Sequence, residues 1–199
     1  MKNLFQSELW GKFQQQIPSR GKYWIIDGVL LIRHKLPFGL YWIECPMSDR
    51  IPEIKKDRNA VFIRFIPDIR KNESFTPPEN FRKCESHFPR TTIHIGLAKS
   101  EEEILAQMKP KGRYNIGVAR RHGITIHQNN AELDEFYKIH EETAQRDGFH
   151  IHPKSYYEKM LSILDPDHAQ LWTAHYQGKV IAGLIAAYYG ETALYYYGA

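Results

Sequence analysis

The C-terminal part of the chain carries three runs rich in β-branched and aromatic residues, separated by very short connections. The connections are Gln177-Gly178 and Gly190-Glu191, and the runs are AQLWTAHY, VIAGLIAAYY and TALYYYGA. A two-residue loop containing glycine joins antiparallel neighbours, because a parallel pair needs a long crossover. The spacing therefore predicts a three-stranded antiparallel meander, and the rest of the chain must fold around it.

The segments before the meander alternate between strand and helix patterns. Ser100 with Glu103 forms a capping box, and Gly123 and Gly148 are placed to end helices. We expect strands in KYWIIDGVLLIRH, LYWIEC, AVFIRFIP, TTIHIGL and ITIH, and helices that begin at Ser7, Ser100, Pro110, Asn130 and Pro153, with a short one in IPEIKKDRN. This order predicts an α/β (α+β) fold.

The apolar residues of the expected helices define which faces enter the core. In the first helix Trp10 and Phe13 share one face, and Lys12 and Gln14 are expected to turn away from it. Two later helices carry longer apolar stripes, formed by Leu133, Phe136, Tyr137 and His140 and by Tyr157, Met160, Leu161 and Leu164. These stripes predict helices that pack on the meander.

Composition excludes several classes of protein. The two cysteines, Cys45 and Cys84, have no CxxC spacing, so neither a disulfide framework nor a zinc ribbon is expected. The N-terminal segment lacks the apolar core of a signal peptide. The longest apolar run, residues 180–189, is about half of the ~20 residues that a membrane helix needs. We therefore expect a cytoplasmic protein with no transmembrane segment.

Residues 107–124, QMKPKGRYNIGVARRHGI, concentrate positive charge, with no acid between Glu103 and Glu132. A helical wheel places Lys109, Arg113 and Arg120 near one line. Such a face can neutralise the phosphates of a polyanion. Spacing alone favours an ordinary solvated helix whose apolar side packs inward through Tyr114, Ile116 and Val118.

Several stretches together resemble the FemABX family of aminoacyl-tRNA-dependent transferases, which build the interpeptide bridges of peptidoglycan. LFQSELWGKF resembles the N-terminal motif of that family, and QMKPKGRYNIGVARRHGITI resembles its most specific signature. TAQRDGFHIHPKSYYEKM and ALYYYGA are similar to the segments that line its substrate cleft. The resemblance covers nearly the whole chain in the order of the family.

The resemblance implies two domains of the acetyltransferase-like (GNAT-like) fold, the second incomplete in this chain. We expect the first domain in residues 1–90 and the first half of the second in residues 91–199. The last residues, LYYYGA, end within a strand pattern, and the Phe-Lys pair of the family lies in a C-terminal portion that this sequence lacks. The chain is therefore expected to be a fragment, and no catalytic residue is assigned.

The resemblance also implies binding residues. Lys12 matches a lysine that reaches the phosphates of the precursor, and Tyr156 and Tyr197 match tyrosines that contact it. His152 stands where the family commonly has arginine, so either it makes a single phosphate hydrogen bond or another group supplies the charge. Strand alternation predicts Tyr195 and Tyr197 on one face and Tyr196 on the other. The tRNA phosphates would contact the basic side chains of the signature, Lys109, Lys111, Arg113, Arg120 and Arg121.

The function that the resemblance implies is transfer of an amino acid from aminoacyl-tRNA to the stem-peptide amine of a UDP-linked or lipid-linked muropeptide. The aminoacyl-tRNA is the co-substrate, and neither a cofactor nor a metal is expected, because His150 and His152 have no third ligand nearby. Peripheral contact with the inner membrane leaflet is compatible with this role. The basic helix is expected to lie beside a tyrosine-walled cleft.

Two other functions stay open. The first is an acyl-CoA-dependent N-acyltransferase of the same fold, although no R-x-x-G-x-G/A segment for a pyrophosphate is present. The second is a non-catalytic RNA-binding module built on the basic helix.

Overall fold

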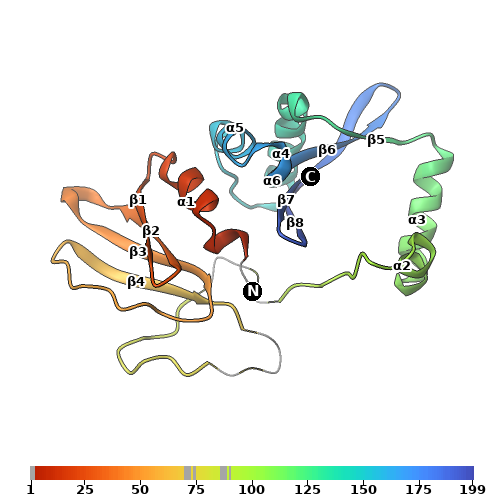
Figure 1. The fold of residues 1–199 in the computed structure, drawn as a ribbon. Helices are drawn as coiled ribbons and strands as arrows, with labels where there is room; N and C mark the ends of the chain where they lie inside the picture. Colours follow the sequence, from red (N-terminus) through yellow and green to blue (C-terminus); the bar gives the residue numbers. More distant parts are fainter. Residues whose placement is uncertain (1–2, 70–72, 74, 86–88, 90) are drawn as a thin grey trace.

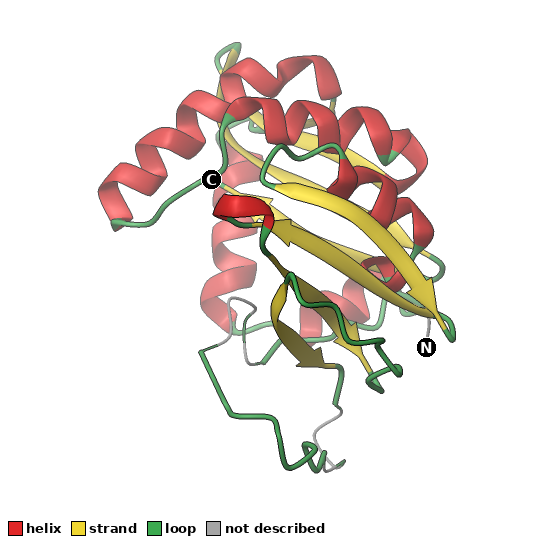
Figure 2. Ribbon diagram, turned by 90° about the vertical axis from the view of Figure 1, so that its left-hand side faces the viewer, coloured by secondary structure: helices red, strands yellow, loops and turns green. Residues whose placement is uncertain are grey.

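The computed structural model describes residues 3–69, 73, 75–85, 89 and 91–199. Among these residues the strands form two four-stranded sheets, with strand orders β1-β2-β3-β4 (sheet 1) and β5-β6-β7-β8 (sheet 2). Sheet 1 and the helix α1 lie on one side of the molecule and sheet 2 with its helices on the other (Figure 1). Figure 2 views the molecule from the side of sheet 1, whose strands stand in front of most of the helices. The predicted α/β fold class is confirmed.

Sheet 1 comes from the N-terminal part of the chain. The pairs β1–β2 and β2–β3 are antiparallel, and β4 runs parallel to β3. The run KYWIIDGVLLIRH turns back at Asp27 and Gly28, both at positive φ. The elements of this part are η1 (Leu4–Gln6), α1 (Glu8–Gln15), β1 (Arg20–Ile26), β2 (Val29–Lys35), η2 (Pro37–Gly39), β3 (Tyr41–Ser48) and β4 (Ala60–Pro67).

Sheet 2 is antiparallel throughout, and its last three strands form the predicted meander. The capping box of Ser100 and the left-handed C-cap at Gly148 are confirmed. The elements are α2 (Glu101–Gln107), α3 (Pro110–Arg121), β5 (Thr125–Gln128), η3 (Asn130–Glu132), α4 (Leu133–Asp147), α5 (Lys154–Ile163), α6 (Asp165–His168), β6 (Ala169–Tyr176), β7 (Lys179–Tyr189) and β8 (Thr192–Gly198).

Helix α1 lies between the two sheets. The Ser7 hydroxyl accepts from the backbone N–H of Trp10 at 3.1 Å, which confirms the predicted cap. Trp10 and Phe13 are buried as expected, but Gln14 is also fully buried, so the prediction that it faces away from the core is wrong. The reason is that sheet 1 and α5 cover different sides of α1, which leaves only a narrow solvated face. Both polar atoms of the Gln14 amide lack a hydrogen-bond partner.

Two further predictions of local structure are wrong. The segment IPEIKKDRN forms no helix; Asp57 is bound to the Tyr41 hydroxyl at 2.5 Å, and Ile54 packs on the outer core of sheet 1. These contacts hold the segment extended along the sheet. TTIHIGL forms no strand, and Ile93 is 87% exposed. A strand needs a neighbour to receive its backbone hydrogen bonds, and no described strand pairs with this segment.

The start of α4 also differs from the prediction. Asn130 was the expected cap, but the side chain of Asn129 accepts from Ala131 N–H and begins the short helix η3. The Asn130 side chain instead accepts from the backbone N–H of Leu171 at 2.8 Å. The turn before α4 is therefore tied to β6, which places α4 over sheet 2.

One hydrophobic cluster joins the two sheets. Phe13 and Leu30 from the first part of the chain and Phe136 and Leu164 from the second belong to the same buried cluster. A second, smaller cluster covers the other face of sheet 1 around Leu31. The expected domain boundary between residues 90 and 91 stays a prediction, and residue 90 lies outside the described residues. No helix of the described chain is both long enough and apolar enough to cross a bilayer.

Candidate functional site

The predicted precursor-binding residues from the second part of the chain meet in one aromatic cluster. The hydroxyl of Tyr197 on β8 donates to that of Tyr156 on α5 at 3.4 Å. The His152 ring, just before α5, stacks on Tyr156 with ring centres 3.9 Å apart and an angle of 17°. The side chain of Tyr156 is buried rather than open to a groove, because Phe13 of α1 packs on its other side. The cluster thus lies where α1 meets α5.

A β-bulge in β8 forms one wall of this cluster. Ile185 pairs with Tyr197 and Ala186 with Tyr195, so Tyr196 is an extra residue with no opposite partner. The expected alternation of the three tyrosines is therefore wrong, since a bulge turns neighbouring side chains toward the same side. The rings of Tyr196 and Tyr197 lie 4.5 Å apart and pack on the core, while Tyr195 is 68% exposed.

Hydrogen bonds between buried polar groups hold the residues of the cluster in place. The Tyr157 hydroxyl accepts from the backbone N–H of His152 at 3.3 Å and bonds to Nε2 of His140 at 3.2 Å. His140 is buried, and its Nδ1 lacks a partner. These bonds fix the loop before α5, so the His152 ring is held against Tyr156.

The electrostatics of the cluster favour neutral side chains. Burial lowers the pKa of His152, and the nearby positive charges of Arg20 and His140 lower that pKa further. Burial also raises the pKa of Tyr197, with smaller contributions from Tyr196 and Tyr156. Near neutral pH His152 is therefore uncharged and Tyr197 keeps its proton. The Tyr197 hydroxyl can donate a hydrogen bond, but it is not a base.

Arg20 is the functional candidate that sequence reasoning missed. It begins β1, and its positive charge lowers the pKa of both His152 and Tyr196. Arg20 is therefore a candidate for the group that supplies positive charge near position 152. No signal in the sequence could have identified it, because Arg20 and His152 are far apart along the chain and only the packing of α1 brings them together.

Lys12 lies outside the aromatic cluster, on the solvated face of α1. Its ammonium group forms an ion pair with Glu8 at 3.2 Å, and both side chains are largely exposed. Lys12 lines a shallow hollow of about 430 Å³ together with Lys159 of α5. Lys159 follows Tyr156 by about one helical turn, so the hollow and the aromatic cluster both adjoin the contact between α1 and α5.

The basic residues of α3 are partly engaged within the α2–α3 pair. The guanidinium of Arg113 donates to the carbonyls of Leu105, Ala106 and Met108 at the end of α2. Arg120 forms an ion pair of 2.7 Å with Glu101 at the start of α2. The two arginines thus share one face, as the helical wheel predicts, and that face meets α2.

The remaining basic residues of α3 face solvent. Arg121 lies over the ring of Tyr114 at 5.9 Å, and Lys109 and Lys111 are exposed with no partner among the described residues. Tyr114 is itself 64% exposed, so the expectation that this side of the helix packs inward is wrong for it. Neither helix of the pair has a buried residue, because no part of the described chain covers them.

The basic helix is not beside the aromatic cluster. In Figure 1 α2 and α3 stand at the edge of the molecule beyond β5, on the far side of sheet 2 from α1. None of the five basic residues lines either of two hollows of the described chain, with volumes of about 480 and 430 Å³. The expected arrangement of a basic helix beside a tyrosine-walled cleft is therefore wrong for this structure.

No group of three or more His, Cys, Asp or Glu side chains able to hold a metal ion occurs in the part of the chain that the structure describes. Cys45 is buried, which raises the pKa of its thiol to about 12, while Cys84 is exposed. The cluster itself offers hydroxyl groups that can donate hydrogen bonds and aromatic rings, and the positive charge of Arg20 acts on it. Such groups can bind and orient a polar ligand.

Comparison with known proteins gives one family. A model described as the FemAB family matches residues 80–197, more than half of the chain. A UDP-N-acetylmuramoylpentapeptide-lysine N(6)-alanyltransferase of Weissella viridescens is 27% identical over 71% of this chain. A lipid II:glycine glycyltransferase of Staphylococcus saprophyticus and one of Staphylococcus aureus are each 24% identical, over 58% and 61% of this chain.

A solved structure gives the same fold. The crystal structure of FemX matches 99% of this chain with a TM-score of 0.76, at 15% identity, and the match covers 75% of that chain. Measured against the curated relatives, the chain is short: it covers 47% of the alanyltransferase and 31% of the glycyltransferase of Staphylococcus saprophyticus.

Proposed function

Because the chain belongs to the FemAB family, we propose that it transfers an amino acid from aminoacyl-tRNA to the stem-peptide amine of a peptidoglycan precursor. The matched relatives are named as a lysine alanyltransferase and as lipid II glycyltransferases. The observation that carries the proposal is that Tyr197 of β8 meets His152 and Tyr156, about forty residues earlier in the matched region, in one cluster. The reaction class is acyl transfer in the construction of an interpeptide bridge.

Transfer from an aminoacyl ester needs little acid–base or nucleophilic catalysis by side chains. An aminoacyl ester is already activated, so the protein has mainly to align a neutral amine with the ester carbonyl and to stabilise the oxyanion. We propose that Tyr156 and Tyr197 contact the precursor, and burial raises the pKa of Tyr197 so that its hydroxyl can donate a hydrogen bond. The structure carries no assignment of a catalytic residue, and no metal or cofactor is needed beyond the aminoacyl-tRNA.

We propose that Arg20 binds a phosphate of the precursor in place of a charged side chain at position 152. His152 is neutral near pH 7, since burial and Arg20 both lower its pKa. A guanidinium binds phosphate through two parallel hydrogen bonds, which an uncharged imidazole cannot do. Lys12 and Lys159, which line the hollow beside the α1–α5 contact, provide two further cations for the diphosphate or its sugar-linked part.

The tRNA contact is proposed for the solvated side of α3. Lys109, Lys111 and Arg121 are free to neutralise phosphates, whereas Arg113 and Arg120 first hold α2 and α3 together. A tRNA is long enough for its body to rest on α3 while its acceptor end reaches the α1–α5 contact. A lipid-linked precursor would bring the protein to the cytoplasmic face of the membrane.

The test is a binding and transfer experiment on the whole chain. We expect UDP-linked muropeptide to bind saturably in calorimetry, and Arg20→Ala to weaken this binding about tenfold or more, since a charged phosphate contact is lost. Arg20→Lys should lose less, and Lys179→Ala, at the exposed start of β7, should change nothing. Transfer is then measured with labelled alanyl-tRNA and glycyl-tRNA.

Other outcomes point to the other functions. Salt-dependent binding of structured RNA without any muropeptide binding would indicate an RNA-binding module. A rise of the melting temperature with acetyl-CoA, but not with muropeptide, would indicate an acyl-CoA-dependent enzyme. Either result contradicts the proposal.

A further inference from the structure

A fully exposed aromatic residue stands at one end of sheet 1. Phe38, in the turn η2 between β2 and β3, is 100% exposed and has a positive φ of 60°. Pro37 and Gly39 flank it, and Leu40 next to them is 37% exposed. An exposed phenylalanine at the tip of a turn buries no apolar surface within this chain, so its ring is available to contact a membrane or another protein.

More apolar side chains lie at the same end of the sheet. Tyr41 pairs with Ala60, so β4 begins beside the start of β3, directly after the turn. The first residues of β4 after Ala60 are Val61 and Phe62, which are 56% and 46% exposed. Phe38, Leu40, Val61 and Phe62 therefore make one end of sheet 1 apolar.

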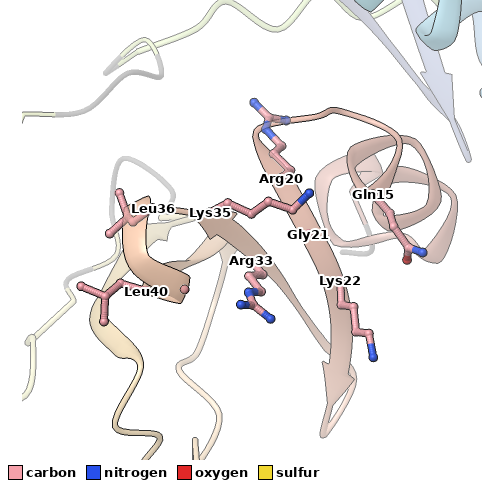
Figure 3. Close-up of a pocket in the computed structure, with 9 residues that line it drawn as sticks. Gln15, Arg20, Gly21, Lys22, Arg33, Lys35, Leu36 and Leu40 are labelled. Atoms are coloured by element: carbon pink, nitrogen blue, oxygen red, sulfur yellow. The ribbon is translucent and has the colours of Figure 1, made fainter.

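A basic hollow adjoins this apolar end. The hollow has a volume of about 480 Å³, and its lining includes Arg20 and Lys22 of β1 and Arg33 and Lys35 of β2, with Leu36 and Leu40 beside them. Figure 3 shows the side chains of Lys22, Arg33 and Lys35 extending over the β1–β2 ribbon, while Arg20 points away from Lys22 and Arg33. No carboxylate lines the hollow. None of the three cations forms an ion pair with a described residue.

The backbone of β1 is shaped to hold these cations. A bulge between Arg20 and Tyr23 interrupts the pairing of β1 with β2. At the bulge Gly21 leaves room for the Arg33 stem, since a Cβ on Gly21 would stand 3.0 Å from Cδ of Arg33. The Arg33 guanidinium lies over the Tyr41 ring at 4.3 Å, and its Nε is buried without a partner. The Tyr41 hydroxyl already donates a hydrogen bond to the Asp57 carboxylate. This bond lowers the pKa of Asp57, and the charge of Arg33 lowers it further.

We propose that this end of sheet 1 is a docking surface for an anionic lipid bilayer. The η2 surface, as we call it, consists of Lys22, Arg33, Lys35, Phe38 and Leu40. Cations attract the phosphates of anionic lipids, and an apolar tip beside them enters the interface. Charge complementarity and the apolar tip together select a bilayer over a soluble phosphate, which would use the cations and leave Phe38 in water.

This surface goes beyond the transfer reaction. Arg20, proposed above to bind the precursor, also lines the basic hollow, and it is not one of the five residues of the η2 surface, which lie outside the α1–α5 cluster. The docking proposal depends on the proposed function in one respect only: a lipid-linked precursor would bring the protein to a membrane. Docking needs neither tRNA nor muropeptide, so a vesicle experiment without them tests it alone. Failure of docking leaves the transfer proposal untouched, and failure of transfer leaves docking untouched.

The experiment is flotation of the whole chain with two kinds of vesicle. We expect binding to vesicles of phosphatidylglycerol and phosphatidylcholine in equal parts, and little to phosphatidylcholine alone. Lys22→Glu and Lys35→Glu should each weaken binding about fivefold or more, since each cation at an anionic surface contributes about that factor. Phe38→Ser should weaken it about tenfold, from lost apolar burial. Circular dichroism confirms that each variant folds.

Matched controls separate the η2 surface from general charge and apolarity. Lys179→Glu makes the same charge change and Ile181→Ser the same kind of apolar change on exposed residues of sheet 2, and both should bind like the parent chain. Equal binding to the two kinds of vesicle would overturn the proposal. So would unchanged binding by Phe38→Ser combined with displacement by an RNA oligonucleotide, which would make the basic hollow a nucleic-acid site.

Discussion

The two helix pairs of the second part of the chain behave in opposite ways. The pair α4–α5 buries a continuous stripe on sheet 2, with Phe136, Tyr157 and Met160 fully inaccessible to solvent. The pair α2–α3 buries no residue, although it has a capping box and a proline in its first turn. Capping and proline position therefore predict where a helix begins, but they do not predict whether it packs.

The difference has a consequence for function. A helix pair that packs can hold side chains such as His152 and Tyr156 in fixed positions, because neighbours restrict their rotamers. A pair held only by Arg113 and by the Arg120–Glu101 contact keeps its other cations in water. The first kind of surface suits recognition of a small ligand, and the second suits phosphates whose positions vary.

The largest expected difference between the pairs is in side-chain truncation. Phe136→Ala should lower the free energy of unfolding by about 3–5 kcal/mol, because it opens a cavity under α4. Tyr114→Ala on α3 should change it by less than about 0.5 kcal/mol. Urea unfolding of both variants measures this. A large loss for Tyr114→Ala would mean that α3 packs on something in solution.

A smaller effect is expected from adding a methyl group in each pair. A Cβ at Gly183 of β7 would stand 2.7 Å from Cδ2 of Phe136, so Gly183→Ala should destabilise by about 1–3 kcal/mol. At Gly117 of α3 the nearest atom is the flexible end of Arg121 at 3.4 Å. Gly117→Ala should therefore raise the stability of α3 by about 0.5–1 kcal/mol. Helicity by circular dichroism and thermal unfolding compare the two, and equal effects would contradict the comparison.

The smallest effect concerns pH. Burial lowers the pKa of His140, so the unfolded chain takes up a proton more readily than the folded chain. Stability is then fully present above about pH 6.5 and falls as the pH decreases below it, by roughly 1 kcal/mol per unit of pKa depression. His152 acts in the same direction.

The pH prediction is tested by urea unfolding at about pH 7.5 and about pH 5.5. His140→Gln should reduce the difference between the two values, since one of the two buried imidazoles is removed. His122→Gln, on the exposed end of α3, should leave the difference unchanged. A difference that persists in full in His140→Gln would assign the pH dependence to another group.

Local sequence signals predicted most elements but not their surroundings. The meander, the caps at Ser7 and Ser100 and the C-cap at Gly148 follow from turn and capping chemistry, which depends on residues within a few positions. IPEIKKDRN and TTIHIGL carry the right local patterns for a helix and a strand and form neither. The first is held extended by distant partners such as Tyr41, and the second has no strand beside it.

The candidate site divides in the same way. The motifs that resemble the family led to His152, Tyr156 and Tyr197, and the structure brings these three together; their roles stay predictions. Arg20 could not be found from the sequence, because its approach to His152 depends on how α1 packs between the sheets. The bulge at Tyr196 could not be found either, since it arises from pairing with Ile185 and Ala186.

By itself, the sequence determined most of the strands and helices, the antiparallel meander and the family to which the chain belongs, because these depend on periodicity, turns and short motifs. Only the tertiary structure decided that Gln14 is buried, that Tyr196 turns inward and that the charge of Arg20 acts on the pKa of His152. The physical reason is that burial, register and the electrostatic environment of a side chain are set by neighbours far away in the chain.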